Sequence, residues 1–208
     1  MSIRLNNTDV ESKVNVRERQ SKGVYILADN PNLYEVQRTN NFEFVVTGVS
    51  EMLRVGAIGT ESNAYVENAQ EVLRLSNVKG FVPHFTQTSI EVRRGNNVMK
   101  YAGVPSFDSG TLTYNDYIGA DTKAVLEAWQ NLSYNVKTEK VGLASDYKKD
   151  CYMIEYTPDL QKVRQYILHG CWISSLSESD RDHESNNKSQ ITVTIQYDWA
   201  EPDTNDLV

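Results

Sequence analysis

The stretch SNNKSQITVTIQYDWAEP, residues 185–202, holds the most regular alternation of apolar and polar residues in the chain. A period of two predicts a β-strand that has one apolar and one polar face. The apolar face is expected to meet the protein core and consists of Ile191, Val193, Ile195 and Tyr197. The polar face carries Thr192, Thr194, Gln196 and Asp198. Lys and Glu are common on solvated strand faces, so these short side chains leave two readings open: ordinary solvent, or a confined wet surface.

Further segments predict a mainly β chain. Strand-like alternation occurs at 42–48, 111–117, 151–158 and 163–173, and the turn-type sequence Thr-Pro-Asp at 157–159 joins the last two. Residues 89–101 predict a hairpin that turns at Gly-Asn-Asn, 95–97. The segment VLRLSNVKGFVP, residues 72–83, alternates imperfectly and is also expected to form a strand.

One segment has a clear helical pattern. In KAVLEAWQNLSY, residues 123–134, the apolar residues recur at helical spacing, and Asp121 and Thr122 precede them as expected capping residues. The residues expected to face the core are Val125, Trp129 and Leu132. A weaker helical pattern falls at 65–71. The fold predicted from these elements is an antiparallel β-sandwich or half-barrel with one flanking α-helix.

The length of 208 residues favours one principal domain. Residues 1–30 are polar and charged, and we expect them to form an N-terminal arm. Residues 31–200 form the expected β domain, in which 49–70 is an insertion or inter-ring loop, and 201–208 form a C-terminal tail. We expect the two cysteines, Cys151 and Cys171, to be reduced core residues, because no apolar signal segment precedes the domain.

The charge balance argues against nucleic-acid binding. The net charge is −7, to which residues 1–100 contribute +1 and residues 101–208 contribute −8. Affinity for the phosphate backbone depends largely on Lys and Arg that displace counterions, and in this chain the 21 Lys and Arg are outnumbered by 28 Asp and Glu. No apolar run reaches the roughly 18 residues of a membrane span, so membrane binding is not expected either.

Motifs of catalysis or metal binding are missing from the sequence. It has no nucleophile elbow, no HExxH, no phosphate-binding loop and no CxxC. The histidines His84, His169 and His183 are far apart and are expected to be ordinary surface or strand residues. The acidic run at 180–184 lacks the oxygen count and the glycine of a calcium loop, so a solvated loop is expected. We therefore expect no enzyme activity, no cofactor and no metal.

Seven short motifs follow one another along the chain. In chain order they are PNLYEV (31–36), RGNNVMKYAGVPSFDSGTLTYND (94–116), VLEAWQ (125–130), DYKKD (146–150), GCW (170–172), SNN (185–187) and ITVTIQYDW (191–199). Each motif is weakly specific alone, but the set in this order resembles the tail tube protein of contractile-tailed bacteriophages.

The resemblance implies a β-sandwich whose subunits form hexameric rings. The inner sheets of a ring join into one continuous β-barrel, and the rings stack into a hollow tube inside a contractile sheath. The tube carries the genome during ejection into the host. The lumen-facing residues would then be Thr192, Thr194, Gln196 and Asp198, a weakly acidic wall that repels phosphates.

The resemblance also implies partners and a location. The expected partners are other copies of the chain, the sheath protein, and baseplate and tail-terminator proteins. The tape measure protein and genomic DNA would pass through the lumen without specific binding. The protein would be a late product, assembled in the host cytoplasm and found in the virion. Expected inter-ring contacts join the hairpin tip to an acidic loop and involve Arg93, Arg94, Glu178, Asp180 and Asp182.

Three alternatives remain open from the sequence. A tube initiator or baseplate-proximal ring protein would share the same fold, and so would the inner tube of a phage-derived injection machine. A monomeric β-sandwich that binds a carbohydrate or peptide belongs to a different class. The 12 tyrosines and 3 tryptophans keep that class open, because such modules often present aromatic platforms.

Overall fold

The computed structural model describes residues 36–56, 68–184 and 186–203. The predicted arm at 1–30 and nearly all of the predicted strand at 31–36 lie outside these residues. The chain divides into two compact units, Met1–Thr39 and Asn40–Val208. The second unit contains all the elements discussed below.

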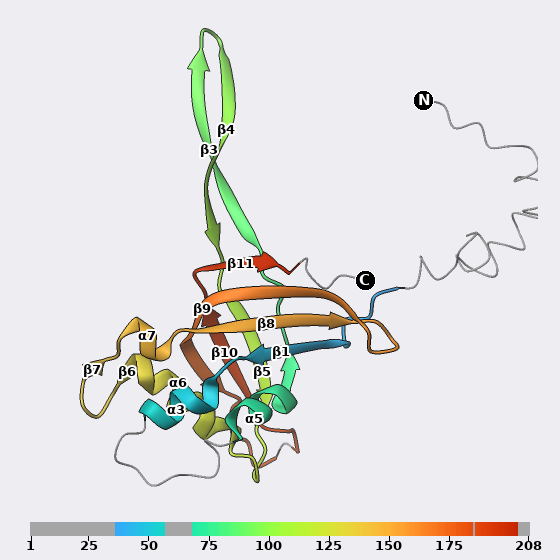
Figure 1. Ribbon diagram of the computed structural model, residues 1–208, viewed down its shortest axis with the longest axis vertical. Coiled ribbons are helices and arrows are strands. Elements are labelled where there is room, and N and C mark those ends of the chain that lie inside the picture. The colour runs from blue at the N-terminus through green and yellow to red at the C-terminus, as the bar shows by residue number, and fades with distance from the viewer. Residues whose placement is uncertain (1–35, 57–67, 185, 204–208) are drawn as a thin grey trace, which may run out of the picture. The chain divides into compact units, whose positions relative to one another are not determined.

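A seven-stranded antiparallel sheet dominates the described residues (Figure 1). Its order is β1-β8-β9-β10-β5-β2, and β11 pairs with the edge of β9 opposite β8, past the end of β10. The strands are β1 (Phe42–Val46), β2 (Asn77–Lys79), β5 (Gly110–Asn115), β8 (Lys149–Tyr156), β9 (Lys162–Glu178), β10 (Gln190–Gln196) and β11 (Trp199–Pro202). The first part of β9 pairs with β8 and its last part pairs with β10, so this long strand joins two curved sheets into a half-barrel. The predicted mainly β half-barrel is confirmed. Strand β11 also crosses the domain boundary that we predicted after residue 200.

Helices close the open side of the half-barrel. They are α3 (Val49–Gly56), α5 (Ala69–Ser76), α6 (Thr122–Ser133) and the short α7 (Ala144–Tyr147). Helix α6 is the flanking helix predicted from the sequence, and α3, which falls in the segment expected to be an insertion, packs on the same core. The prediction of a strand from residue 72 is wrong, because 69–76 is helical. Ala69, Leu73 and Ser76 share the buried face of α5, a spacing that suits a helix on the core.

The predicted capping of α6 is also wrong. Asp121 adopts a left-handed conformation with φ 48°, and no side-chain cap hydrogen bond forms. The Thr122 hydroxyl is buried and has no hydrogen-bond partner in the described part of the chain. The start of α6 is instead fixed by the backbone, since the Asp121 amide donates to the Tyr117 carbonyl.

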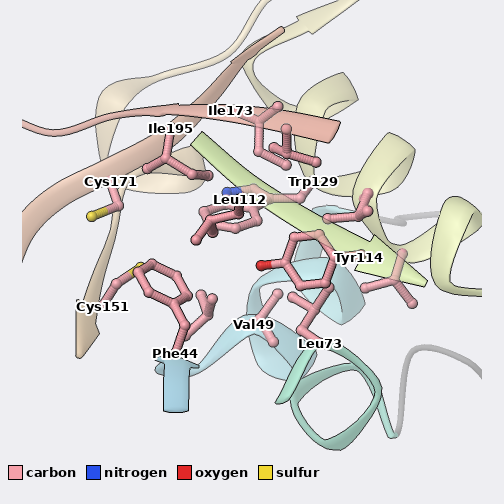
Figure 2. Close-up of a cluster of buried hydrophobic side chains, with 14 of the residues drawn as sticks. Phe44, Val49, Leu73, Leu112, Tyr114, Trp129, Cys151, Cys171, Ile173 and Ile195 are labelled. Carbon is pink, nitrogen blue, oxygen red and sulfur yellow. The ribbon is translucent and has the colours of Figure 1, made fainter. Parts of the chain in front are cut away.

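The core gathers side chains from the sheet and the helices (Figure 2). On β10, Ile191, Val193 and Ile195 are completely buried, and Tyr197 follows them into the same cluster. From α6, Val125 and Trp129 are buried, whereas Leu132 is partly buried at the margin. Cys151 and Cys171 are free and buried in this cluster, and burial raises the pKa of the Cys151 thiol.

Two hairpins stand apart from the main sheet. Strands β3 (Phe85–Arg94) and β4 (Asn97–Phe107) pair with each other and project from it as a long ribbon (Figure 1). Gly95 has a φ of 61° at the tip, which confirms the predicted turn. The shorter hairpin consists of β6 (Tyr134–Asn135) and β7 (Lys140–Val141), which follow α6.

Candidate functional site

The polar face of β10 extends across both neighbouring strands. Thr192 lies opposite Thr113 on β5 and Ser177 on β9, and Thr194 lies opposite Thr111 and Ser175. Because alternate residues point to the same side of a sheet, these positions form one surface, which we call the hydroxyl face. Its polar members are Thr111, Thr113, Asn115, Ser175, Ser177, Gln190, Thr192, Thr194 and Gln196, and Trp172, opposite Gln196, borders them.

None of these nine side chains carries a charge. The nearest charged neighbours lie at the borders, where Lys79 on the edge strand β2 is opposite Thr113 and Glu178 ends β9. Hydrogen bonds hold several of the side chains against the sheet. Ser177 Oγ donates to the Thr192 carbonyl at 3.5 Å, and Gln190 Nε2 donates to Asn115 Oδ1 at 3.3 Å. The face thus offers short, fixed polar groups, and the cation nearest to it is Lys79 at its β2 border.

Asp198 differs from the other three residues that we predicted on this strand face. It lies beyond the end of β10, and Lys148 Nζ donates to its two carboxylate oxygens at 2.7 and 2.8 Å. The lysine balances the carboxylate, so Asp198 does not make the face acidic as expected. The sequence gives no local signal for this pair, because the two residues are 50 positions apart.

Gly170 on β9 makes room for this carboxylate. Its φ is 68°, a conformation that favours glycine, and a β-carbon there would lie 2.2 Å from Asp198 Oδ2. The sequence motif GCW therefore contains a glycine that the local packing requires.

The predicted inter-ring residues lie at opposite ends of the unit. Arg93 and Arg94 are exposed at the tip of the β3–β4 ribbon, at the top of Figure 1. Asp180 and Asp182 are exposed in the loop between β9 and β10, which lies at the bottom. Within the described ranges, neither arginine has an ion-pair partner in its own chain.

Glu178 is already paired inside the chain. Its carboxylate contacts Lys123 Nζ at 2.5 Å and Arg181 Nη2 at 3.0 Å. The hydrogen bond from Lys123 lowers the pKa of Glu178, and the same contact raises the pKa of Lys123. Glu178 therefore ties the end of β9 to α6, and Asp180 and Asp182 remain exposed in the loop together with Glu184.

The three histidines occupy separate places. His84 lies 3.3 Å from Asp108, and His183 is exposed in the acidic loop. His169 stacks on Trp199 and lies between Asp150 and Glu201, at 3.3 and 3.5 Å. Among the described residues no group of three or more His, Cys, Asp or Glu is placed to hold a metal ion. In the same residues, no helix is long and apolar enough to cross a membrane.

Comparison of the sequence finds no matching family model and no matching curated protein. Comparison of the structure finds the cap of the anti-feeding prophage, described as its tube terminating cap, with a TM-score of 0.59 and 15% identity. That match covers 82% of this chain and 92% of the cap chain. The chain has the fold of injection-system tube components.

Two further structures share this tube fold. A chain of the sheath–tube complex of the PVC extracellular contractile injection system matches with a TM-score of 0.55 and 15% identity, over 81% of this chain and 92% of its own. The sheath/tube terminator of that system matches with a TM-score of 0.57 and 17% identity, over 82% and 98%. At such low sequence identity, structural similarity establishes the fold, whereas function depends on the residues of the surfaces.

In this tube fold, the hydroxyl face lies on the side of the sheet away from the helices. Ile191, Val193 and Ile195 point into the core that α3, α5 and α6 cover, and the intervening residues of β10 point outward. The uncharged hydroxyl face thus lies on the side of the sheet opposite the helices.

Proposed function

We propose that this chain is the structural subunit of the inner tube of a contractile bacteriophage tail, and that hexameric rings of it stack into a conduit for genome ejection. The observation that supports this most directly is the uncharged hydroxyl face on three adjacent strands of a chain with the tube fold. In a ring, the inner sheets of the copies join into one continuous β-barrel. The hydroxyl face then lines the channel.

The chemistry of this face suits a conduit. A surface that passes DNA must not hold it, and tight binding to phosphates requires Lys or Arg. The proposed lumen carries Thr192, Thr194 and Gln196, and Asp198 lies at its margin with its charge balanced by Lys148. Such a wall neither attracts nor strongly repels the phosphate backbone, so the DNA slides past hydroxyl and amide groups.

When rings stack, one end of a subunit meets the opposite end of a subunit in the next ring. Arg93 and Arg94 at the ribbon tip of one ring meet Asp180 and Asp182 in the loop of the next ring. Glu178 belongs to the same acidic surface but keeps its bonds to its own chain. The opposite positions of these charges support a head-to-tail contact, which repeats without limit and so builds a tube.

The remaining roles follow from a tube. The sheath protein surrounds it, baseplate and tail-terminator proteins meet its two ends, and the tape measure protein and genomic DNA pass through it. The subunit is a late protein that assembles in the host cytoplasm and stays in the virion. It performs no catalysis and takes no cofactor.

One observation favours a second candidate of the same fold. Two of the similar structures are a tube terminating cap and a sheath/tube terminator, and a baseplate chain of the anti-feeding prophage matches with a TM-score of 0.54. The chain would then form a single ring at one end of a tube, as an initiator, a baseplate-proximal ring or a terminator. Electron microscopy of the purified protein separates the two: long tubes support the tube subunit, and single rings support the end ring.

Particles with a charged lumen test the proposed conduit. The double variant Thr194→Lys and Gln196→Lys should fold and assemble normally, because both side chains lie outside the core. It should slow DNA ejection and reduce infectivity at least tenfold, since the added cations hold phosphates. The control variant Thr194→Gln and Gln196→Asn changes size without charge and should behave like the parent. Full infectivity of the lysine particles would contradict a lumenal position for this face.

A further inference from the structure

An exposed apolar surface surrounds the short β6–β7 hairpin. Tyr134 and Val141 lie opposite each other in the hairpin, and Val136 and Leu143 lie within two residues of them. The exposed fractions of these four residues, which we call the β6–β7 patch, range from 48% to 77%. A cluster of large apolar side chains in water is typical of a surface that binds a partner.

The β6–β7 patch is held in place by its own chain. The Gly142 amide donates to the Ser133 carbonyl at 3.0 Å, and the Asn135 side chain accepts from the amides of Lys137 and Thr138. Just beyond the hairpin, the Tyr147 carbonyl accepts from the Trp129 indole at 2.9 Å. The hairpin is therefore anchored to the core helix α6 and presents its apolar residues in a fixed arrangement.

A second exposed apolar surface lies on α5 and the strand that follows it. Leu75, Val78 and Val82 are 38% to 66% exposed, and we call them the α5–β2 patch. Leu75 points away from the buried face of α5. In the described sheet β2 pairs only with β5, so it is an edge strand, and apolar edge strands recruit other chains unless they are covered.

The two patches lie on opposite flanks, and charged residues of both signs border each of them. Figure 1 shows β6, β7 and α7 at the left and α5 at the right of the helical side. Lys137, Glu139 and Lys140 flank the first patch. Glu71, one helical turn before Leu75, and Lys79, next to Val78, flank the second. None of these charged residues has an ion-pair partner among the described residues, so opposite charges of two copies are free to pair.

We propose that the β6–β7 patch of one copy packs on the α5–β2 patch of the next copy around the ring, with Lys137 and Lys140 near Glu71. The occupant of each patch is thus a second copy of this chain. Two different patches on opposite flanks form a head-to-tail contact, and such a contact closes into a ring when each copy is rotated relative to the last. This inference rests on the proposed function, because it requires that the chain forms rings.

A head-to-tail contact makes a specific prediction for two variants that each damage one patch. Val136→Glu places a charge in the β6–β7 patch, and Leu75→Glu places one in the α5–β2 patch. Both sites are exposed, so the variants should fold and melt like the parent. Each alone should be monomeric at concentrations where the parent forms rings. An equimolar mixture should form one-to-one dimers that grow no further, because each variant still offers one intact patch.

Mass photometry of the two variants and their mixture measures this directly. The matched control is Leu160→Glu, which adds the same charge at an exposed leucine in the turn between β8 and β9. The control should form rings. Rings from both patch variants would overturn this inference and leave the proposed tube function intact. Patch variants that form rings but do not bind sheath protein would show that the patches bind the sheath, and this result would also overturn the inference. A parent chain that never leaves the monomer state would instead contradict the proposed function.

Discussion

Trp129 is the side chain whose removal should test the packing of α6 most severely. It is 1% exposed, and its indole donates a hydrogen bond to the Tyr147 carbonyl at 2.9 Å. It lies in the core between α6 and the sheet, as Figure 2 shows. The substitution Trp129→Ala removes both the packing and the hydrogen bond, whereas Trp129→Phe keeps most of the apolar volume and removes the hydrogen bond.

The two substitutions should differ in how much they lower the free energy of unfolding. Because Trp129 is almost fully buried, Trp129→Ala should leave a large cavity and lower it by about 3–5 kcal/mol. For Trp129→Phe the loss should be about 1–3 kcal/mol, since the Tyr147 carbonyl is left without its donor. In a chain of this length each kcal/mol lowers Tm by about 2–4 °C. The alanine variant should therefore melt about 6–20 °C below the parent.

Thermal and urea unfolding of the unassembled chain supply the measurement. Trp199→Ala is the matched control, because Trp199 is 44% exposed and its ring stacks only on His169 in the described structure. That control should lose about 0.5–1.5 kcal/mol. If Trp129→Ala costs no more than Trp199→Ala, the reasoning that α6 is fixed to the sheet by this side chain is refuted.

Three further predictions concern the glycines and one ion pair. Gly170→Ala should cost about 1 kcal/mol or more in urea unfolding, because φ is positive and the new methyl group meets Asp198; an unchanged midpoint would contradict this. Gly110→Ala should lower the free energy of unfolding by about 1–3 kcal/mol, since the new β-carbon would lie 2.1 Å from the Phe81 ring. This loss requires that the backbone at residue 110 does not shift away from the ring. Glu178 has a lowered pKa in the folded state, so its contribution to stability is present above about pH 4.3 and is lost as the pH falls through the folded pKa. Glu178→Gln should therefore be less stable than the parent at pH 7 and approach it near pH 3; an equal difference at both values would exclude the ion pair as the cause.

The elements that could be predicted from the sequence are those with a purely local signal. The alternation of 191–197 specifies a strand, and the structure has β10 there with every second residue buried. The helical spacing that ends at Leu132 likewise specifies α6. In both cases the residues that decide the element lie within a dozen positions of one another, so no knowledge of the rest of the fold is needed.

Helix α5 shows how a local signal can mislead. From Val72 onward, Leu73, Leu75 and Val78 alternate well enough to favour a strand. The helical pattern appears only when Ala69 is included, because Ala69, Val72, Leu73 and Ser76 then recur at intervals of three and four. The core selects the helix, since it buries Ala69 and Leu73 together.

The electrostatics of the candidate channel depend on contacts that the sequence hides. From the sequence Asp198 is expected to make the wall acidic, but in the structure Lys148, which lies between α7 and β8, pairs with it. From the sequence Glu178 is expected to contact the next ring, but in the structure it pairs with Lys123 of α6. Partners so distant along the chain produce no periodic pattern or motif spacing in the sequence. Only the folded structure therefore reveals that both charges are balanced.

A reconstruction of the assembled particle by electron cryo-microscopy tests the central claim most directly. It should place Thr192, Thr194 and Gln196 of every copy on the inner wall of a continuous barrel, with the helices α3, α5 and α6 on the outer side. A particle in which these three side chains face the sheath, an adjacent ring or open solvent outside the tube would contradict the account.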